Sequence, residues 1–333
     1  MNIGVASLIG VEPIPFPDLV QWAAAHDIPA LEVNFGPGFP RIGEALYGGH
    51  LDLDAIVASG SGAVEEALGD SGVHIASLAP MINLMTGDLG LRAERIAVMR
   101  KTIDACQILG VDTVVTFAGS AFGMHFWGLP GVAGNHPSNR VAANLAIFQE
   151  VYSPLADYAA ERGVRIAFET AGRGGPEGNI AQSPELWDAM FEAVPSPALG
   201  LSFDPSHLIW LHVPHIGDVI RAHGSRIYHV DGKDCEIMPA RLARQGILGN
   251  DWWRYRLPGL GSVPWPEVFS ALRDVGYDGV VAIENEDPLC PGLAGVAWAA
   301  EYLRGVLLPP AGTAVVAPIR PTVAERAKDT HQP

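Results

Sequence analysis

Four apolar segments of the sequence each end at or next to an acidic residue or a histidine. The segments span residues 164–169, 199–203, 226–230 and 279–284, and the polar residues are Glu169, Asp204, His229 and Glu284. Three carboxylates held close together would repel one another and raise one another's pKa values. A divalent cation removes that repulsion, and oxygen ligands with one imidazole suit Mn²⁺, Mg²⁺ or Co²⁺ better than a cysteine-rich zinc site does. We therefore predict that these four residues hold one divalent cation, with Mn²⁺ as the first choice.

Further polar residues lie near the same segments. His207 follows the second segment and is expected either to support the metal site or to donate to a substrate oxygen. Lys233 is expected to pair with Asp234 or with substrate hydroxyls. Either Asp231 or Asp234 could orient the imidazole of His229, as carboxylates commonly do for histidine ligands.

A metal site of this kind favours removal of a proton from a carbon next to a carbonyl. The cation would bind the carbonyl oxygen and an adjacent hydroxyl and would stabilise the enediolate charge, while a carboxylate takes the proton. Return of the proton to the other face gives epimerisation, and return to the neighbouring carbon gives isomerisation. A leaving group β to the carbonyl would instead be lost by elimination.

The four segments belong to a longer series of short β-branched apolar segments that alternate with stretches of helical periodicity. We predict strands at 2–8, 30–34, 73–78, 112–117, 164–169, 199–203, 226–230 and 279–284. We predict helices near 16–26, 52–70, 91–109, 139–162, 183–193, 214–223, 264–275 and 292–305. Eight strand–helix units in series predict an α/β fold, a (β/α)8 TIM barrel over residues 1–308, with polar strand ends at its mouth.

Two connections that follow strands are longer than barrel closure requires. One spans about 118–138 and carries Phe122, His125, Phe126, Trp127 and His136; the other spans about 231–263 and carries Trp252, Trp253, Arg254, Tyr255 and Arg256. Both are expected over the active-site face, as lids or substrate walls, although ordinary surface insertions would look similar. The candidates for substrate contact are Arg173, Lys233, Trp252, Trp253 and Arg254. His125 or His136 could be an additional acid or base.

The composition restricts the possible partners. The chain has 333 residues, 37 Asp and Glu against 21 Lys and Arg, and a formal net charge of −16, which disfavours nucleic acid and anionic membranes. A barrel nuclease would need a basic groove, and a metal-free binding protein would not need four ligand residues in series. Three scattered cysteines and a start without a signal sequence predict a cytoplasmic protein with reduced thiols. Residues 309–333 are expected to form a tail, either disordered or in contact with another subunit.

Several motifs resemble the xylose isomerase-like TIM barrel proteins of the sugar phosphate isomerase/epimerase group. The resemblance covers roughly residues 1–307 and rests on the segments 168–169, 203–207, 229–234, 252–261 and 283–287. It implies that Glu169, Asp204, His229 and Glu284 are the metal ligands. It also implies that the two glutamates form the acid–base pair and that His207 contacts the substrate. The segment 170–175 lacks the acidic residue that ketose epimerases of the group place one turn after the first ligand.

The segment 252–261 resembles a branch of these barrels that acts on sugars oxidised at C3. Some members of that branch are lyases that detach carbon- or oxygen-linked aglycones and work with a small β-rich partner subunit. An aromatic wall at the mouth would suit a planar aglycone. The resemblance therefore implies a sugar isomerase or epimerase, or alternatively a lyase of 3-oxo-glycosides, acting alone, as a homo-oligomer or with such a partner.

Overall fold

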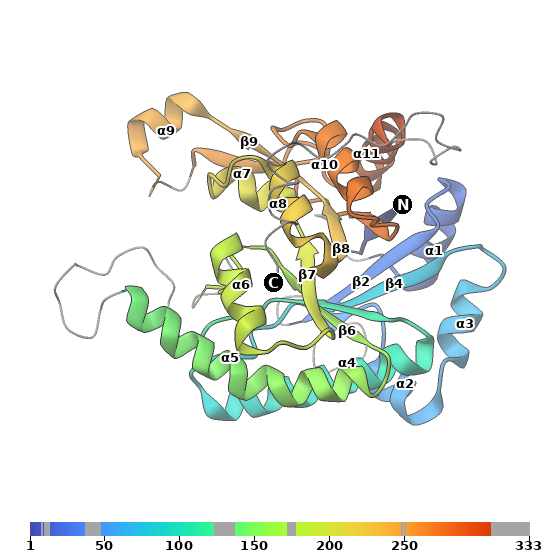
Figure 1. Cartoon of the computed structure of the whole chain (residues 1–333). Helices are drawn as coiled ribbons and strands as arrows, with labels where there is room; N and C mark the ends of the chain where they lie inside the picture. The colour runs from blue at the N-terminus through green and yellow to red at the C-terminus, as the bar shows by residue number, and fades with distance from the viewer. Residues whose placement is uncertain are drawn as a thin grey trace, which may run out of the picture.

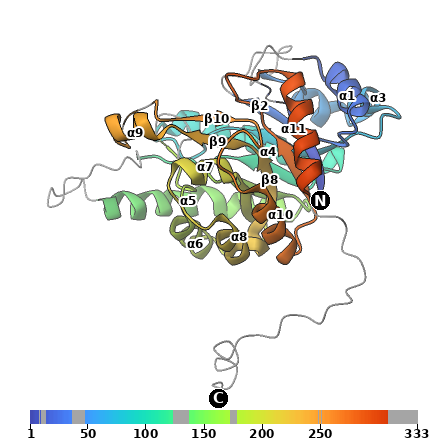
Figure 2. The same ribbon diagram turned by 90° about the horizontal axis from the view of Figure 1, so that it is seen from above.

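The computed structural model describes residues 1–7, 9, 14–36, 48–122, 137–171, 178–247, 249 and 251–307. Within them, eight parallel strands close into a barrel that is surrounded by helices (Figures 1 and 2). The strands are β1 (Asn2–Ala6), β2 (Ala30–Gly36), β4 (His74–Pro80), β5 (Thr113–Thr116), β6 (Arg165–Glu169), β7 (Leu199–Phe203), β8 (Ile227–Gly232) and β11 (Val280–Ile283). Strand β1 pairs with both β2 and β11, which closes the sheet. The predicted (β/α)8 barrel is confirmed, and every predicted strand overlaps an observed one.

The helices that follow the strands cover the outside of the barrel. They are α1 (Phe16–Ala25), α2 (Leu53–Ser59), α3 (Gly62–Leu68), α4 (Leu89–Leu109), α5 (Pro137–Ala160), α6 (Pro184–Ala193), α8 (Ile216–His223), α10 (Trp265–Asp274) and α11 (Leu293–Val306). The short helix α7 (Pro205–Trp210) lies at the strand ends instead. The helix predicted over 52–70 is two helices, because Gly60 adopts φ +88° and ends α2. A two-residue strand, β3 (Gly48–Gly49), extends β2 in antiparallel pairing, and a 3-10 turn, η1 (Gly224–Arg226), precedes β8.

An aromatic cluster fixes β6 against the helix that precedes it. Phe168 meets the rings of Phe148 and Tyr152 on α5 edge-on, with centroids 5.5 and 4.9 Å apart. All three side chains are fully buried, and each such pair contributes about 0.5–1.5 kcal/mol beyond the burial itself. Since side chains alternate along a strand, the outward position of Phe168 turns Glu169 into the barrel.

The long connection after β8 contains an antiparallel hairpin. Its strands are β9 (Asp234–Ile237) and β10 (Trp253–Arg256), and α9 (Pro239–Gln245) lies between them. The hairpin and α9 project from the barrel (Figures 1 and 2). The long aromatic connection predicted after β8 is therefore a folded hairpin, and it lies on the face where the barrel strands end.

Two predicted segments fall largely or wholly outside the described residues. The tail at 309–333 is one, and most of the connection at 118–138 is the other. Among the helices that are described, none is both long and apolar enough to cross a membrane.

Candidate active site

The carboxyl ends of β6 and β7 bring three potential ligands together. Glu169 ends β6, and Asp204 follows β7 and caps α7, accepting a hydrogen bond from the Ser206 amide through Oδ1 at 2.7 Å. Pro205 at the first helical position starts α7 immediately, and one turn of helix returns His207 over the strand ends. His207 Nε2 lies 3.1 Å from Asp204 Oδ2 and 3.6 Å from Glu169 Oε1. One potential ligand atom from each of these three buried residues lies within 4.8 Å of the other two.

A buried lysine connects this group to the end of β11. Lys233 Nζ donates to Glu284 Oε2 at 2.6 Å and to Glu286 Oε2 at 2.9 Å, and it lies 3.4 Å from Asp204 Oδ2. The Lys233 side chain is 2% exposed, so these carboxylates replace its hydration. Glu284 is therefore at the mouth with Glu169 and Asp204, as the sequence predicted. Its nearest charged neighbour among the described residues is the ammonium of Lys233.

Asp234 does not pair with Lys233; it fastens the hairpin instead. Its two oxygens accept hydrogen bonds from the amides of Cys235, Gly259 and Val263 and from Trp265 Nε1, at 2.8–3.3 Å. These four donors satisfy both carboxylate oxygens of Asp234. Asp234 is therefore a structural residue of the connection rather than a partner of Lys233 or of a substrate hydroxyl.

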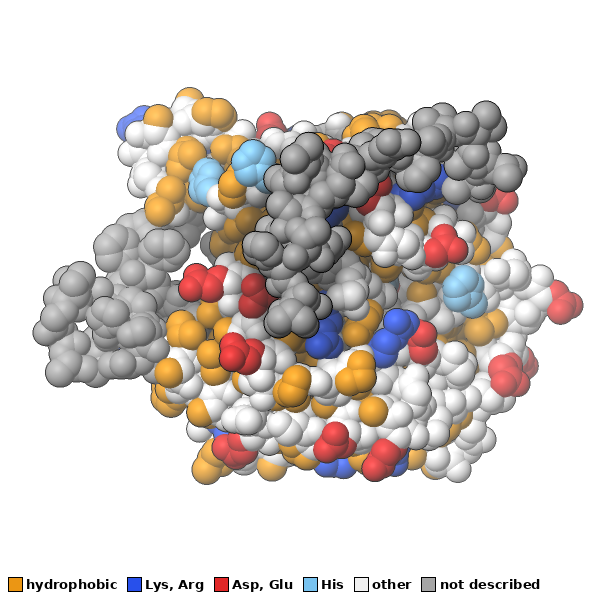
Figure 3. Space-filling model, viewed as in Figure 1, with side chains coloured by type: hydrophobic (Ala, Val, Ile, Leu, Met, Phe, Trp, Pro, Cys, Tyr) orange, Lys and Arg blue, Asp and Glu red, His pale blue; other side chains and the backbone are white. Residues whose placement is uncertain are grey.

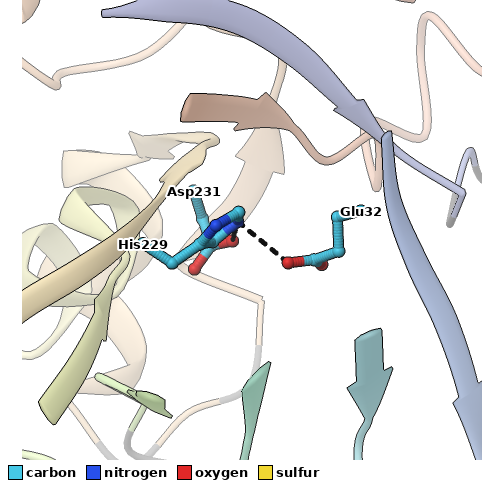
Figure 4. A group of neighbouring side chains, drawn as sticks. All are labelled: Glu32, His229 and Asp231. Carbon is cyan, nitrogen blue, oxygen red and sulfur yellow. Dashed lines mark ion pairs between the residues drawn. The ribbon is translucent and has the colours of Figure 1, made fainter. Parts of the chain in front are cut away.

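His229 belongs to a second group, with Glu32 of β2 and Asp231 of β8 (Figure 4). Its Nε2 lies 2.9 Å from Glu32 Oε2 and 3.7 Å from Asp231 Oδ1. Glu32 also accepts hydrogen bonds from Asn34 Nδ2 and Ser77 Oγ at 2.9 and 3.1 Å. The other oxygen of Asp231 accepts from Ser202 Oγ at 2.8 Å.

Of the four predicted ligands, Glu169 and Asp204 therefore share one group, Glu284 adjoins them through Lys233, and His229 faces Glu32. Glu32 was not among the predicted ligands. Its signal was an acidic residue within the otherwise apolar segment 30–33, which a buried strand carries only if a partner satisfies it.

Burial and charge displace the pKa values of these groups. Burial raises the pKa values of Glu169 and Glu284 well above the usual range, and neighbouring carboxylates add to the effect while Lys233 opposes it. Burial, and then repulsion by Glu32, raises the pKa of Asp231 to about 7. Burial alone would lower the pKa of Lys233, but Glu284, Glu286 and Asp204 raise it well above its ordinary value.

The Glu32–His229 pair shifts in the direction of an ion pair. Burial acts to raise the pKa of Glu32, but attraction to His229 and hydrogen bonds from His229, Asn34 and Ser77 outweigh it and lower that pKa. Burial likewise acts to lower the pKa of His229, and Glu32 with Asp231 raises it. Both partners are therefore held in their charged forms.

One face of the hairpin supplies an aromatic wall beside the site. Tyr255 Oη lies 3.0 Å from His207 Nε2, and its ring lies beneath Lys233 Nζ, 4.4 Å from the centroid. Trp253 stacks on Trp210 of α7, with centroids 4.7 Å apart and an interplanar angle of 4°. We call Trp210, Trp253 and Tyr255 the aromatic wall.

The other predicted substrate contacts lie elsewhere. Trp252 is buried, stacks on His212 and donates to the carbonyl of Ile247, and Arg254 pairs with Glu236 at 2.7 Å. Since side chains alternate along β10, both residues lie on the opposite face from the aromatic wall. His125 and Arg173 lie outside the described residues.

The donor set fits a divalent cation. Glu169 Oε2 and Asp204 Oδ2 are buried, and neither accepts a hydrogen bond within the described part of the chain. Burial of such carboxylates costs free energy unless a cation, a proton or further hydrogen-bond donors compensate their charge. Within the described residues, Lys233 supplies one positive charge beside Glu169, Asp204 and Glu284, which does not balance three carboxylates.

Comparison with known proteins agrees with this architecture. The family model of the xylose isomerase-like TIM barrel matches residues 20–306. The chain is 29% identical over 312 residues to the uncharacterized protein YfiH of Bacillus subtilis (strain 168), over 87% of this chain and 95% of that protein. It is 24% identical over 268 residues to D-psicose 3-epimerase of Agrobacterium fabrum, over 79% and 80% of the two chains. The solved structure of the IOLI protein with a binding zinc atom superposes with a TM-score of 0.65 at 18% identity, over 92% of this chain and 96% of that one.

Proposed function

The chain belongs to the xylose isomerase-like TIM barrel family, and on that premise we propose that it is a divalent-metal-dependent sugar isomerase or epimerase. The reaction is abstraction of a proton next to a sugar carbonyl to give an enediolate. The observation that carries the proposal is the buried group at the strand ends, where the Lys233 ammonium pairs with Asp204 and Glu284, and Glu169 lies close to Asp204 and His207. The relatedness to a D-psicose 3-epimerase supports the same class of substrate.

The residues proposed to hold the cation are Glu169, Asp204 and Glu284, with one further ligand from β8, where the sequence predicts His229. When bound there, Mn²⁺, or alternatively Mg²⁺ or Co²⁺, supplies a Lewis acid for the negative charge that develops on the carbonyl oxygen. The zinc atom of the IOLI protein, a structural relative, supports a divalent cation in a barrel of this kind.

Glu169 and Glu284 are proposed as the acid–base pair. Burial raises the pKa values of both carboxyls, which brings them nearer to the range in which a carboxyl can both take and return a proton at neutral pH. Lys233 holds Glu284 at 2.6 Å and so fixes the direction from which that carboxylate faces the substrate.

His207 is proposed as the group that positions a substrate oxygen. Its Nε2 faces Asp204, Glu169 and Tyr255 Oη, all within 3.6 Å. Two carboxylates that accept hydrogen bonds and one hydroxyl therefore surround this nitrogen. A sugar hydroxyl that enters the site can replace one of these contacts. The aromatic wall beside it covers the apolar face of a sugar ring and limits access of water.

Deuterium exchange tests this proposal most directly. Mn²⁺-loaded enzyme is incubated in D₂O with a panel of free ketohexoses, and NMR follows deuterium incorporation at the carbon next to the carbonyl. We expect incorporation with or without net conversion, loss of it after chelation, and loss of it in Glu284→Gln. His74→Ala, a change at an exposed residue at the start of β4, is the control. No incorporation from any member of the panel would contradict the proposal.

A second candidate is a lyase that cleaves 3-oxo-glycosides by β-elimination, with a small partner subunit. The observation that favours it is the Trp210–Trp253 stack, a flat apolar surface that suits a planar aglycone. The same enzyme preparation is therefore offered a 3-oxo-glucoside with an aromatic aglycone. Release of aglycone without exchange into ketohexoses would favour the lyase.

A further inference from the structure

Strand β8 presents two polar side chains to the barrel interior, and they lie at different depths. His229 and Asp231 are two residues apart, so both point to the same side of the strand, with Asp231 nearer to its carboxyl end. Either could face the residues at the mouth. The register of the neighbouring strands and the contacts of His229 decide between them.

The register sets Asp231 beside Asp204, whereas His229 lies beside Ser202, the partner of Glu169. Ser202 of β7 pairs with His229 and Phe203 pairs with Val230, so the next step along the chain sets Asp204 beside Asp231. On the other side Asp231 pairs with Ala282, and the amide of Glu284 reaches the carbonyl of Gly232 at 3.3 Å. Asp231 thus lies beside Asp204 and two residues before Lys233, which the register sets beside Glu284, and His229 lies one pleat deeper than Asp231.

The imidazole of His229 forms an ion pair with Glu32 at that deeper level, although its Nε2 makes no hydrogen bond within the described residues. Its Nε2 lies 2.9 Å from Glu32 Oε2, on the β2 side of the barrel (Figure 4). Asn34 and Ser77 fix the Glu32 carboxylate from β2 and β4, so the acceptor cannot turn away without losing two hydrogen bonds. A metal bond from Nε2 would require His229 to leave this partner.

We propose that Asp231, not His229, is the ligand from β8, and that Glu32 and His229 form a buried support which positions the Asp231 carboxylate. The cation would then have four carboxylate ligands: Glu169, Asp204, Asp231 and Glu284. This inference rests on the metal site proposed above and changes its chemistry. Ligation by oxygen alone favours Mn²⁺ and Mg²⁺ over Zn²⁺, which prefers nitrogen and sulfur.

Pulsed EPR of Mn²⁺-loaded protein tests the inference without any assay of activity. A directly bound imidazole couples its ¹⁴N nucleus to the Mn²⁺ electron spin, whereas a carboxylate does not. His207 adjoins the site, so spectra are recorded for the wild type, His229→Gln and His207→Gln, with metal content measured in each. We expect no ¹⁴N coupling that depends on His229, and stoichiometric Mn²⁺ in His229→Gln. Asp231→Asn, which keeps the size of the side chain, should lose stoichiometric Mn²⁺.

A ¹⁴N coupling that persists in His207→Gln and disappears in His229→Gln would overturn this inference while leaving the metal site intact. A wild-type protein that binds no Mn²⁺ would overturn the proposed function itself. Asp231→His gives a second measurement that does not depend on the folding of His229→Gln. It should introduce a ¹⁴N coupling and raise the affinity for Zn²⁺ relative to Mn²⁺, and an unchanged metal preference would count against Asp231 as a ligand.

Discussion

At the scale of single residues, the site is dominated by carboxylates that are compensated unequally. Glu32 has an imidazole and two hydrogen-bond donors, whereas Glu169 Oε2 accepts no hydrogen bond within the described residues. Lys233 compensates Glu284, Glu286 and Asp204 together. Among the described residues, Lys233 therefore supplies the positive charge beside Glu284, Glu286 and Asp204, and a bound cation would share that task.

Replacement of Lys233 by methionine should destabilise the metal-free protein. Loss of one partner from a buried ion pair costs about 3–5 kcal/mol, since the remaining carboxylates stay buried without compensation. The free energy of unfolding in urea measures the effect, and added Mn²⁺ should recover part of the loss. Lys101→Met removes a lysine from a partly exposed pair with Asp54 and should cost about 0–1 kcal/mol. Equal effects of the two changes would contradict this account of Lys233.

Asp231 should make the stability of the metal-free protein depend on pH. Folding raises its pKa from 3.8 to about 7, so the folded state binds this proton more tightly than the unfolded state does. The resulting stabilisation is complete below the ordinary pKa and is lost as pH rises through about 7. Urea unfolding at several pH values should therefore show that the wild type loses stability relative to Asp231→Asn over this interval. With Mn²⁺ present, the stability gained should instead increase with pH, because the cation binds the deprotonated carboxylates. Parallel pH profiles of the two metal-free proteins would show that Asp231 has an ordinary pKa.

At the scale of elements, the β9–β10 hairpin and the turn that follows β10, residues 257–263, place the aromatic wall. Asp234 accepts hydrogen bonds from both sides of this turn, and Gly261 lies against it. A Cβ at position 261 would lie 2.2 Å from Asp234 Oδ1 and 2.6 Å from the carbonyl oxygen of Cys235. The turn therefore requires glycine for close approach of the backbone to a fixed carboxylate.

Gly261→Ala should lower the stability of the protein by about 1–3 kcal/mol, the usual cost of forcing extra volume into a packed region. Activity should fall further than stability alone explains, since the turn holds the hairpin that carries Tyr255. Thermal unfolding and steady-state kinetics of the same preparation separate the two effects. Gly305→Ala, in α11 with open space around its position, should be neutral or slightly stabilising. An unaltered Tm in Gly261→Ala would show that the turn can rearrange.

The elements also show what the sequence could reveal. The eight barrel strands were predictable because each is a short apolar segment next to a stretch of sequence with helical periodicity. The ends of β6, β7 and β11 were predictable as the positions of Glu169, Asp204 and Glu284 for the same reason. Strand β10 was not predicted, although the alternation in residues 252–256 indicates a strand. The pairing of Glu32 with His229 could not be read from the sequence, because it depends on β2 and β8 facing each other across the closed barrel.

At the scale of the whole molecule, the excess of acidic residues creates a negative field around a site that carries carboxylates of its own. The formal net charge is −16, and on the face in Figure 3 the Asp and Glu side chains are spread over the surface. Such a field attracts divalent cations and repels anionic ligands, while a neutral sugar experiences little of it. The charge of the protein thus favours an unphosphorylated substrate.

Ionic strength should therefore act on metal uptake and leave sugar binding unchanged. Trp210 and Trp253 stack close to the proposed site, so quenching of tryptophan fluorescence can follow Mn²⁺ association in a stopped-flow instrument. The association rate should fall as inert salt is added, because screening shortens the range of the negative field to about 8 Å at physiological ionic strength. The KM for a free ketohexose, measured with saturating Mn²⁺, should not change over the same range, and a phosphorylated ketohexose should bind more weakly at low salt than at high salt. A rate of Mn²⁺ association that is independent of salt would mean that the carboxylates at the mouth, rather than the surface charge, govern metal capture.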